Sequence, residues 1–257
     1  MLKVSVITAV LNGLDAVKRT VDSVVEQTYP NVEYIVVDGA STDGTSEYLQ
    51  SRRHEFAAMR SERDRGAYDA FNKGLSLATG DVIGYLNAGD VFTDRDVLVR
   101  IMAPFSDPEI GAVFGDVAMI RDADMNRVVR RYGSNTFRPS RVRFGFMPAH
   151  PTLYMRRSVY QLSGEYDPTF KIAGDYDLVI RTFVKRRTNY RYIPEILVRM
   201  PVGGLSTRGW RSKWLITNEM RRACAKNGIH TNLLLLSLRF PVKLIQQLWH
   251  RSGFACG

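Results

Sequence analysis

The sequence predicts an α/β fold in which helices flank a mainly parallel sheet. Two observations carry this prediction. Apolar, often β-branched runs alternate with segments whose apolar residues recur at helical spacing, as expected for successive βαβ units. Turn residues close several of the runs, with Asn12-Gly13 after the first and Asp38-Gly39 after the second. The 257 residues suit one large domain, or one domain with an appendage.

The first half of the chain alternates regularly. Strands are expected over Val4–Val10, Val32–Val37, Ala57–Ser61, Asp81–Leu86 and Ile110–Ile120. Helices are expected over Leu14–Gln27, Thr45–Arg53, Tyr68–Ala78 and Asp96–Phe105. The segment Ser41–Asp43 resembles a cap for the second of these helices.

The second half is less regular, and residues 121–145 are rich in arginine without a clear period. A strand that leads into a helix is expected over Thr152–Tyr160, and a strand over Tyr190–Met200. Helices are expected over Asp175–Arg186, over Trp210–Asn227 with Gly228 as the stop, and over Leu233–His250 with an interruption at Pro241.

Basic residues gather in the last fifth of the chain. The whole sequence holds 36 Lys and Arg against 26 Asp and Glu, and residues 201–257 hold nine Lys or Arg against one acid. Such an asymmetry points to an anionic surface, either membrane lipid or nucleic acid. Leu233–Leu238 is nearly all apolar, and the segment after Pro241 is amphipathic. An interfacial membrane helix is expected, and a helix packed on the catalytic domain is the alternative.

The sequence also bears on the cellular compartment. The two cysteines, Cys224 and Cys256, support neither a disulfide framework nor a zinc site, so a reducing compartment is expected. The N-terminus lacks the charged start and cleavage site of a signal peptide. No apolar run reaches the roughly 18 residues of a transmembrane helix. These features predict a cytoplasmic protein.

Three turns predict where a site lies. Thr8–Gly13, Asp38–Gly44 and Asn87–Asp90 follow the first, second and fourth expected strands. Ligands bind parallel sheets beyond the carboxyl ends of the strands, so these turns are expected to meet at one edge. Asp90 offers a carboxylate there, and Mg²⁺ often uses one or two carboxylates plus phosphates. A helix cap or a turn is the plainer reading of Asp90, and also of an acid in Asp175–Asp177.

Six motifs in order give the chain its resemblance. VSVITAVLNG, YIVVDGASTDGT and SERDRGAYDAFNKGLSLATGD are followed by YLNAGD, AHPTLYMRRSVYQLSGEYDPTF and IAGDYDLVIR. Over roughly its first four fifths the chain resembles family 2 glycosyltransferases of the GT-A fold. In that family the first three motifs form the nucleotide-binding turns, and YLNAGD stands where the metal-binding D-x-D-like motif belongs. The last two resemble the acceptor-side segment and the motif that carries the base.

The resemblance implies roles for the matching residues. The nucleotide-sugar would be bound by Thr8, Ala9, Asn12, Asp38, Asp64, Gly66, Asn72, Lys73 and Asn87. Asp90 would bind a divalent metal, Mg²⁺ or Mn²⁺, and Asp175 would be the catalytic base, with His150 and Asp177 on the acceptor side. Plain alternatives stand beside these roles: Asp38 as a turn residue, Asn72 and Lys73 as a solvated helix face, and His150 as a loop histidine.

Departures from the family pattern affect three positions. Gly89 stands where an Asp is common, so Asp90 is the remaining carboxylate of the metal motif. Gly174-Asp175 replaces a Glu-Asp pair, which makes Asp175 the preferred base and Asp177 the fallback. Asp38-Gly39-Ala40 replaces Asp-Asp-Gly, which removes one acid near the nucleoside.

The resemblance implies an inverting glycosyltransferase with a catalytic domain over residues 1–202, divided into a nucleotide-sugar half (1–120) and an acceptor half (121–202). Residues 203–257 would form a basic, amphipathic helical tail. UDP-sugars are the favoured donors, with GDP- and dTDP-sugars as the alternatives, and the acceptor would be a sugar or a lipid-linked molecule. Bacterial polysaccharide or glycolipid assembly at the inner face of the cytoplasmic membrane is the expected setting.

Two other classes of protein are weighed against this one. A metal-dependent nucleotidyltransferase would need a Gly- and Lys/Arg-rich phosphate loop after the first strand, and Thr8–Gly13 contains no Lys or Arg. A basic nucleic-acid-binding protein would fit the C-terminal charge, but no recognised nucleic-acid-binding module appears in the sequence. Nucleic acid is therefore not an expected partner.

Overall fold

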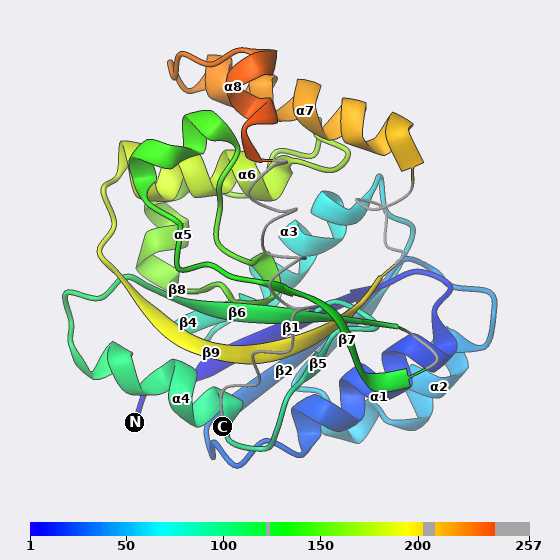
Figure 1. Cartoon of the computed structure of the whole chain (residues 1–257). Helices are drawn as coiled ribbons and strands as arrows, with labels where there is room; N and C mark the ends of the chain where they lie inside the picture. Colours follow the sequence, from blue (N-terminus) through cyan, green and yellow to red (C-terminus); the bar gives the residue numbers. More distant parts are fainter. Residues whose placement is uncertain (122–123, 203–208, 240–257) are drawn as a thin grey trace.

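The computed structural model describes residues 1–121, 124–202 and 209–239 (Figure 1). Within these ranges, nine strands form one sheet in the order β3-β2-β1-β4-β8-β6-β9-β5, and β7 pairs with β6 outside this path. The strands are β1 (Val4–Val10), β2 (Val32–Asp38), β3 (Ala58–Ser61), β4 (Val82–Tyr85), β5 (Val91–Phe92), β6 (Ala112–Arg121), β7 (Asp124–Tyr132), β8 (Tyr154–Arg156) and β9 (Tyr190–Pro201).

Helices connect and cover these strands. They are α1 (Leu14–Val25), α2 (Thr45–Ser51), α3 (Ala67–Leu77), α4 (Val97–Met102), α5 (Arg157–Ser163), α6 (Gly174–Val179), α7 (Gly209–Lys226) and α8 (Leu233–Ser237). Shorter helical turns are η1 (Arg53–Glu55), η2 (Ala103–Ser106), η3 (Pro139–Phe144), η4 (His150–Thr152) and the π-helical η5 (Ile180–Lys185).

The sheet combines a parallel half with an antiparallel half. β1 runs parallel to β2 and β4, and β2 runs parallel to β3, with Val10 opposite Asp38. β8 is antiparallel to both β4 and β6, while β6 runs parallel to β9. The predicted α/β class is thus confirmed, and the first four sequence-predicted strands are in place. Among the antiparallel pairings, β6 and β7 are consecutive strands, while β4–β8, β6–β8 and β5–β9 join strands that are far apart in the sequence.

Alternation along the strands builds a core on each face of the sheet. Val4 and Val6 are fully buried with Val17 and Val21 on the face that α1, α2 and α4 cover. Ile7, which directly follows Val6 and so points to the opposite side of the sheet, is buried on the face covered by α3, α5 and α6. Figure 1 shows the two helical layers on either side of the sheet. Alternate residues of each strand therefore pack against the apolar faces of the helices that cover that side of the sheet.

The C-terminal helices pack on the domain. In α7, Met220, Ala223 and Cys224 are buried in the same core as Tyr176 of α6, and Leu236 of α8 joins them. For the described part of the predicted tail, the structure therefore shows the packed alternative. Residues 240–257, which include the predicted helix after Pro241, lie outside the described residues. Among the helices that the structure does describe, none has the length and apolarity to cross a membrane.

Some elements differ from the sequence-based expectation. The helix expected over Asp175–Arg186 divides into α6 and the π-helical η5. The strand β7 was not predicted, because its outer position leaves adjacent residues exposed: Val128 is 40% and Val129 36% exposed. A strand paired only with β6 needs no apolar alternation, so its sequence does not show the strand period.

The close approach of α3 to β1 yields a testable prediction. A methyl group at Gly74 would collide with Ile7 Cγ2. Gly74→Ala is expected to lower the free energy of unfolding by about 1–3 kcal/mol, because overpacking outweighs the helix propensity gained from alanine. Urea denaturation measures this change. At Gly13, the nearest atoms to an added methyl lie 3.4 and 3.8 Å away, so Gly13→Ala is the matched control. Equal stability of the two variants would contradict the argument.

Candidate active site

The turns after β1, β2 and β4 meet at the carboxyl edge of the sheet, as predicted. The amide of Gly39 donates a hydrogen bond to the Val10 carbonyl at 2.9 Å. On the other side, the amide of Ala88 donates to the Ala9 carbonyl at 3.3 Å. The turn after β1 is therefore held between the other two, because β1 lies between β2 and β4 in the sheet.

Asn12 fastens the first turn to the second. Its backbone is in the left-handed region (φ 49°), which Asn tolerates better than most side chains. Its backbone N–H donates to Ser41 Oγ at 2.8 Å, and its side-chain Oδ1 accepts from the Thr42 backbone N–H at 2.9 Å. Asn12 therefore shapes the loop in which the sequence places the nucleoside.

Two of the predicted nucleoside residues have buried side chains that join strands and turns. Asp38 is fully buried and accepts from Ser41 Oγ and Ser61 Oγ, both at 2.6 Å. Thr8 is also fully buried, and its hydroxyl donates to the Leu86 carbonyl at 2.7 Å. These contacts match the turn-stabilising alternative for Asp38. Direct contact of either side chain with a nucleoside stays a prediction.

Next along the edge, Gly39 lies close to the side chains of Asp64 and Leu11. A Cβ atom at Gly39 would lie 2.8 Å from Asp64 Oδ2 and 3.2 Å from Leu11 Cδ1, so only glycine leaves room for both. Leu11 is 60% exposed although it is apolar. A half-buried acid beside an exposed apolar side chain suits the polar edge and the flat face of a nucleobase.

Lys73 is committed to a cluster of acids. Its Nζ lies 2.7 Å from Asp64, 3.1 Å from Glu62 and 3.2 Å from Asp69. Burial alone would lower the pKa of Lys73, but the hydrogen bonds to Asp64, Glu62 and Asp69 outweigh it and raise the pKa. Lys73 is thus not the solvated surface charge that the sequence offered as an alternative, because three carboxylates surround its ammonium group. Its clear effect is to hold Asp64 in place.

Helix α3 connects this donor side to the acceptor side. It begins at Gly66, whose φ of 131° favours glycine, and its Asn72 faces the segment before α6. Asn72 Nδ2 donates to the Tyr166 carbonyl at 2.8 Å, and Asn72 Oδ1 accepts from the Tyr166 amide at 2.9 Å. Asn72 therefore positions the acceptor-side loop, and its predicted contact with ribose or diphosphate stays untested.

Asp175 lies half-buried at the start of α6. Its Oδ1 accepts hydrogen bonds from the Tyr176 amide at 2.8 Å and from the Tyr68 hydroxyl at 3.3 Å. Burial raises the pKa of Asp175, and the nearby His150 opposes that rise. An acid with a raised pKa is a better proton acceptor once it is ionised, as a general base requires.

His150 lies beside Asp175 in an aromatic cage. Its ring stacks on Phe71 at 5.6 Å between centroids and lies 5.8 Å from the Tyr85 ring. Nε2 is 2.9 Å from the Tyr166 hydroxyl. Burial lowers the pKa of His150, although Asp175 favours its charged form. The structure thus brings together the two residues that the sequence assigned to the base and the acceptor side.

The turn Asn87–Asp90 offers two oxygen donors for a divalent metal. Asp90 is 6% exposed, and no described cationic side chain pairs with it. Burial raises the pKa of Asp90 to about 8, against a weaker opposing hydrogen bond from the Asn87 backbone. Asn87 Oδ1 is also buried, and no described group donates a hydrogen bond to it. Two desolvated hard oxygens fit Mg²⁺ or Mn²⁺.

The metal site would be sparse. Across residues 1–121, 124–202 and 209–239, no three His, Cys, Asp or Glu side chains gather as a metal cluster. A Mg²⁺ site that uses one carboxylate and completes its shell with phosphates and water needs no such cluster. That Asp90 and Asp175 face each other across one cleft stays a prediction.

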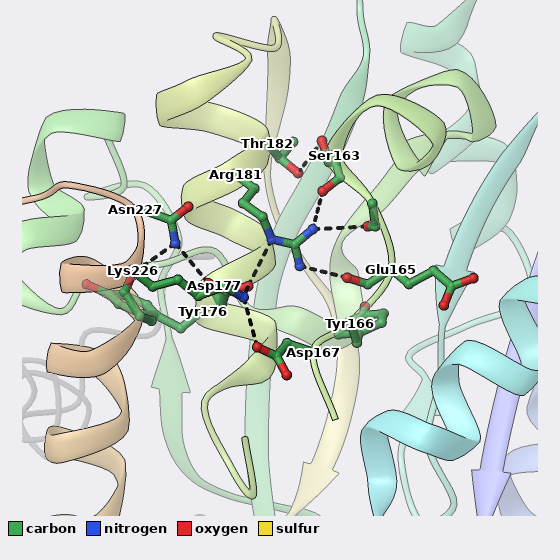
Figure 2. A network of polar contacts seen from close by, with 12 residues as sticks. Ser163, Glu165, Tyr166, Asp167, Tyr176, Asp177, Arg181, Thr182, Lys226 and Asn227 are labelled. Carbon is green, nitrogen blue, oxygen red and sulfur yellow. Dashed lines mark hydrogen bonds and ion pairs between the residues drawn. The ribbon is translucent and has the colours of Figure 1, made fainter. Parts of the chain in front are cut away.

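Asp177 occupies a buried ion-pair network instead of an open acceptor site (Figure 2). It is fully buried, and Arg181 Nε and Asn227 Nδ2 each donate to it at 2.8 Å. Lys226 Nζ lies 3.5 Å away. A carboxylate enclosed by these partners cannot reach an acceptor hydroxyl, so we withdraw the fallback role for Asp177 and keep Asp175 as the candidate base.

Sequence reasoning did not single out several residues that form the site. Tyr68 and Tyr166 lie within motifs that were recognised, but an aromatic at helical spacing reads first as core. Glu219 was noticed only as the single acid of a basic segment. That isolation was a usable signal, because one acid kept among nine basic residues suggests a specific partner.

Comparison with known proteins agrees with the family resemblance of the sequence. The model of the family described as "Glycosyl transferase family 2" matches residues 5–163. An uncharacterized glycosyltransferase of Mycobacterium tuberculosis is 34% identical over 183 residues, covering 69% of this chain and 68% of the relative. A PGL/p-HBAD biosynthesis glycosyltransferase of Mycobacterium bovis is 30% identical over 207 residues, covering 79% of this chain and 78% of the relative.

Solved structures share the fold. The mannosyltransferase PcManGT from Pyrobaculum calidifontis, in complex with GDP-Man and Mn²⁺, superposes with a TM-score of 0.66 at 20% identity, covering 100% of this chain and 76% of its own. S. aureus TarS 1-349 in complex with UDP-GlcNAc also gives 0.66, at 14% identity, covering 98% of this chain and 74% of its own. At such identities the likeness shows the fold alone, and it confirms the predicted GT-A architecture.

Asp90 is buried with no cationic partner in the described part of the chain, which predicts that its ionisation lowers the stability of the metal-free protein. With a folded-state pKa of about 8 and an unfolded value near the usual ~4, the folded state holds the proton longer. The cost is therefore absent below about pH 4, grows as pH rises and is complete above about pH 8. In chelator at pH 8, Asp90→Asn is expected to raise Tm by about 2–4 °C per kcal/mol recovered.

The control for this prediction is Asp43→Asn. The Asp43 carboxylate accepts from Thr45 Oγ1, and that hydrogen bond lowers the pKa of Asp43, so its neutralisation should not raise Tm. Differential scanning fluorimetry from pH 4 to pH 8 measures both variants. Added Mn²⁺ with UDP or GDP should then stabilise the wild type more than Asp90→Asn. A lower Tm for Asp90→Asn at pH 8 would show that Asp90 is already satisfied without a ligand.

Proposed function

Because this chain belongs to glycosyl transferase family 2, we propose that it transfers a sugar from a nucleotide-sugar to an acceptor hydroxyl with inversion at the anomeric carbon. It is a glycosyltransferase of GT-A fold, and the stereochemical outcome, the donor and the acceptor are what we propose. The observation that carries it is the placement of Asp175, half-buried beside His150 and joined to α3 through Tyr68.

Asp175 would act as the general base. Both of its hydrogen bonds from Tyr68 and Tyr176 go to Oδ1, which leaves Oδ2 to receive the proton of the acceptor hydroxyl. The acceptor oxygen forms its bond to the anomeric carbon as the bond from that carbon to the diphosphate breaks. The proton ends on Asp175, and the electron pair leaves with the diphosphate. Fixing the base in this way supplies the orientation that a single displacement needs.

A UDP-sugar is the donor we favour, with a divalent metal. Asp90 and Asn87 would hold Mg²⁺ or Mn²⁺, which when bound neutralises charge on the leaving diphosphate. The engagement of Lys73 supports this requirement, because its ammonium is already shared among three carboxylates. The solved relatives that bind GDP-Man with Mn²⁺ and UDP-GlcNAc support the donor class.

The acceptor we propose is a sugar or lipid-linked hydroxyl in bacterial polysaccharide or glycolipid assembly. The relative named for PGL/p-HBAD biosynthesis supports this setting. The setting would place the enzyme on the inner face of the cytoplasmic membrane, as a peripheral protein. A nucleotidyltransferase or nucleic-acid-binding reading finds no support in the family match.

An exposed apolar surface supports the peripheral location. Leu233, Leu234 and Leu238 are 49%, 74% and 47% exposed around α8. The turn before α8 is fastened to η3, where Thr231 Oγ1 donates to the Arg143 carbonyl at 2.6 Å. Arg143 itself is exposed and has no carboxylate partner among the described residues. We call these residues the α8 surface: leucines beside basic charge suit an anionic lipid interface.

The base assignment is tested by Asp175→Asn. An amide cannot accept the proton, so kcat is expected to fall by about 10²–10⁴-fold with the fold and donor binding intact. A coupled assay of nucleotide release with a UDP-sugar and Mn²⁺ measures turnover, and calorimetry with UDP measures donor-site binding. Asp107→Asn, at an exposed position in the loop after η2, is the control and should match the wild type. Near-normal turnover by Asp175→Asn would remove Asp175 from the base role.

The membrane proposal is tested at the α8 surface. The double variant Leu233→Ser/Leu234→Ser is expected to reduce cosedimentation with anionic vesicles at least about tenfold, because the exposed leucines supply the insertion energy. Leu162→Ser, at a leucine that is 60% exposed on α5, is the matched control and should bind like the wild type. Equal binding by the double variant, or binding unaffected by replacing anionic with neutral lipid, would argue against a lipid-facing α8 surface.

A further inference from the structure

One face of α7 contacts the loop that leads to the candidate base. The contacting residues are Glu219, Arg222, Lys226 and Asn227, whose spacing places them along one side of a helix. Lys226 Nζ lies 2.8 Å from Asp167, and the Arg222 guanidinium lies 3.9 Å from the Phe170 ring centre. The segment 167–177 is therefore attached to α7 at several points along its length.

Glu219 makes the most concentrated of these attachments. Its Oε1 accepts from the Lys171 amide at 2.9 Å, and its Oε2 accepts from the Ile172 and Ala173 amides at 2.8 and 3.0 Å. The side chain is 6% exposed. Three successive backbone N–H groups directed at one carboxylate form a nest that is selective for an anion. Hydrogen bonds of this kind are shorter and stronger than those between neutral groups.

Both backbone polar groups of Ile172 are hydrogen-bonded to side chains. Its N–H donates to Glu219, and its carbonyl accepts from the Tyr68 hydroxyl at 2.5 Å. The same Tyr68 hydroxyl also touches Asp175 at 3.3 Å. Ala173, whose amide is the third bound by Glu219, is the N-cap residue of α6. The orientation of the first turn of α6, and of Asp175 within it, thus depends on Glu219.

We propose that Glu219 is a positioning residue for sugar transfer, which holds the 171–173 backbone so that Asp175 meets the acceptor hydroxyl. The inference rests on the proposed role of Asp175 as the base. Glu219 does not touch the substrate in this account. It acts through the backbone that it binds, from a helix that the sequence assigned to a tail outside the catalytic domain.

Moving the 171–173 backbone would change the surroundings of Asp175, and therefore its pKa. The groups that face Asp175 are Tyr68 of α3, His150 of η4, Tyr132 of β7 and Tyr166 of the acceptor-side loop. Burial is the main cause of the raised pKa of Asp175. If the loop is released, Asp175 becomes better solvated and its pKa falls toward the usual range. The acidic limb of the kcat profile then moves to lower pH, while kcat itself decreases.

The experiment compares Glu219→Gln with Glu33→Gln. The side-chain NH₂ of glutamine donates hydrogen bonds and cannot accept them, so at least one of the three backbone N–H groups loses its partner in Glu219→Gln. We expect kcat to fall by about 10- to 100-fold, since small displacements of a reacting group cost this much, with the donor KM within about twofold. Glu33 accepts from the Thr79 and Gly80 amides at the opposite edge of the sheet, so Glu33→Gln should lower Tm and leave kcat unchanged.

Three measurements decide between positioning and mere stability. The first is turnover, normalised to the fraction of enzyme that binds UDP by calorimetry. The second is the pH profile of kcat. The third is the turnover of Glu219→Asp, which keeps the charge on a shorter side chain. Intermediate kcat in Glu219→Asp and a shift of the acidic limb in Glu219→Gln support the inference. Unchanged kcat and pH profile per folded enzyme would overturn it.

The two proposals fail in different ways. Loss of turnover in Asp175→Asn with normal turnover in Glu219→Gln would retain the base and reject the positioning role. Near-normal turnover in Asp175→Asn would reject the base itself, and the inference about Glu219 with it. Where Glu219→Gln yields too little folded enzyme, Glu219→Asp gives the deciding kcat and pH profile, and wild-type values in that variant would count against positioning.

Discussion

The contact of α3 with the sheet and with the acceptor-side loop is the constraint on which the site depends. Gly74 lets α3 approach Ile7 of β1 more closely than any other residue would allow. At this distance Lys73 reaches Asp64 on the donor side, while Asn72 and Tyr68 reach the acceptor side. One helix thereby relates two halves of a site that are about 100 residues apart in the sequence.

The carboxylates of the site illustrate how environment divides roles among identical groups. Asp38 and Asp177 are fully buried and completely partnered, and both stabilise structure. Asp90 is buried and has no cationic partner among the residues that the structure describes, and a ligand that supplies the missing charge would explain such an acid. Asp175 lies between these cases, with one oxygen fixed and a raised pKa. Pairs of acids whose environments differ in this way commonly divide the work of a reaction.

The sequence predicted the parallel half of the sheet well, because most residues of β1, β2 and β4 are buried, and because α1 and α3 are amphipathic. It also placed Asn12, Asp38 and Asp90 at one edge, since strand order alone decides that. It could not predict that Thr8 and Asn72 hydrogen-bond to distant parts of the protein, because hydrogen bonds between segments far apart in the sequence leave no periodic pattern. The strand β7 was missed for the same kind of reason: it pairs with β6 alone.

The sequence predicts a boundary near residue 202, and the described helices that follow it pack into the core of the residues before it. The exposed side of the C-terminal helices is basic and apolar, which is the property that composition detects. The inner side holds Met220, Ala223 and Cys224 in the common core, and Glu219 on the loop of the candidate base. A helix with two such faces would connect a lipid surface on one side with the base on the other. The charge of the segment describes only the first of these faces, and the shared core of the second face is visible only once the chain is folded.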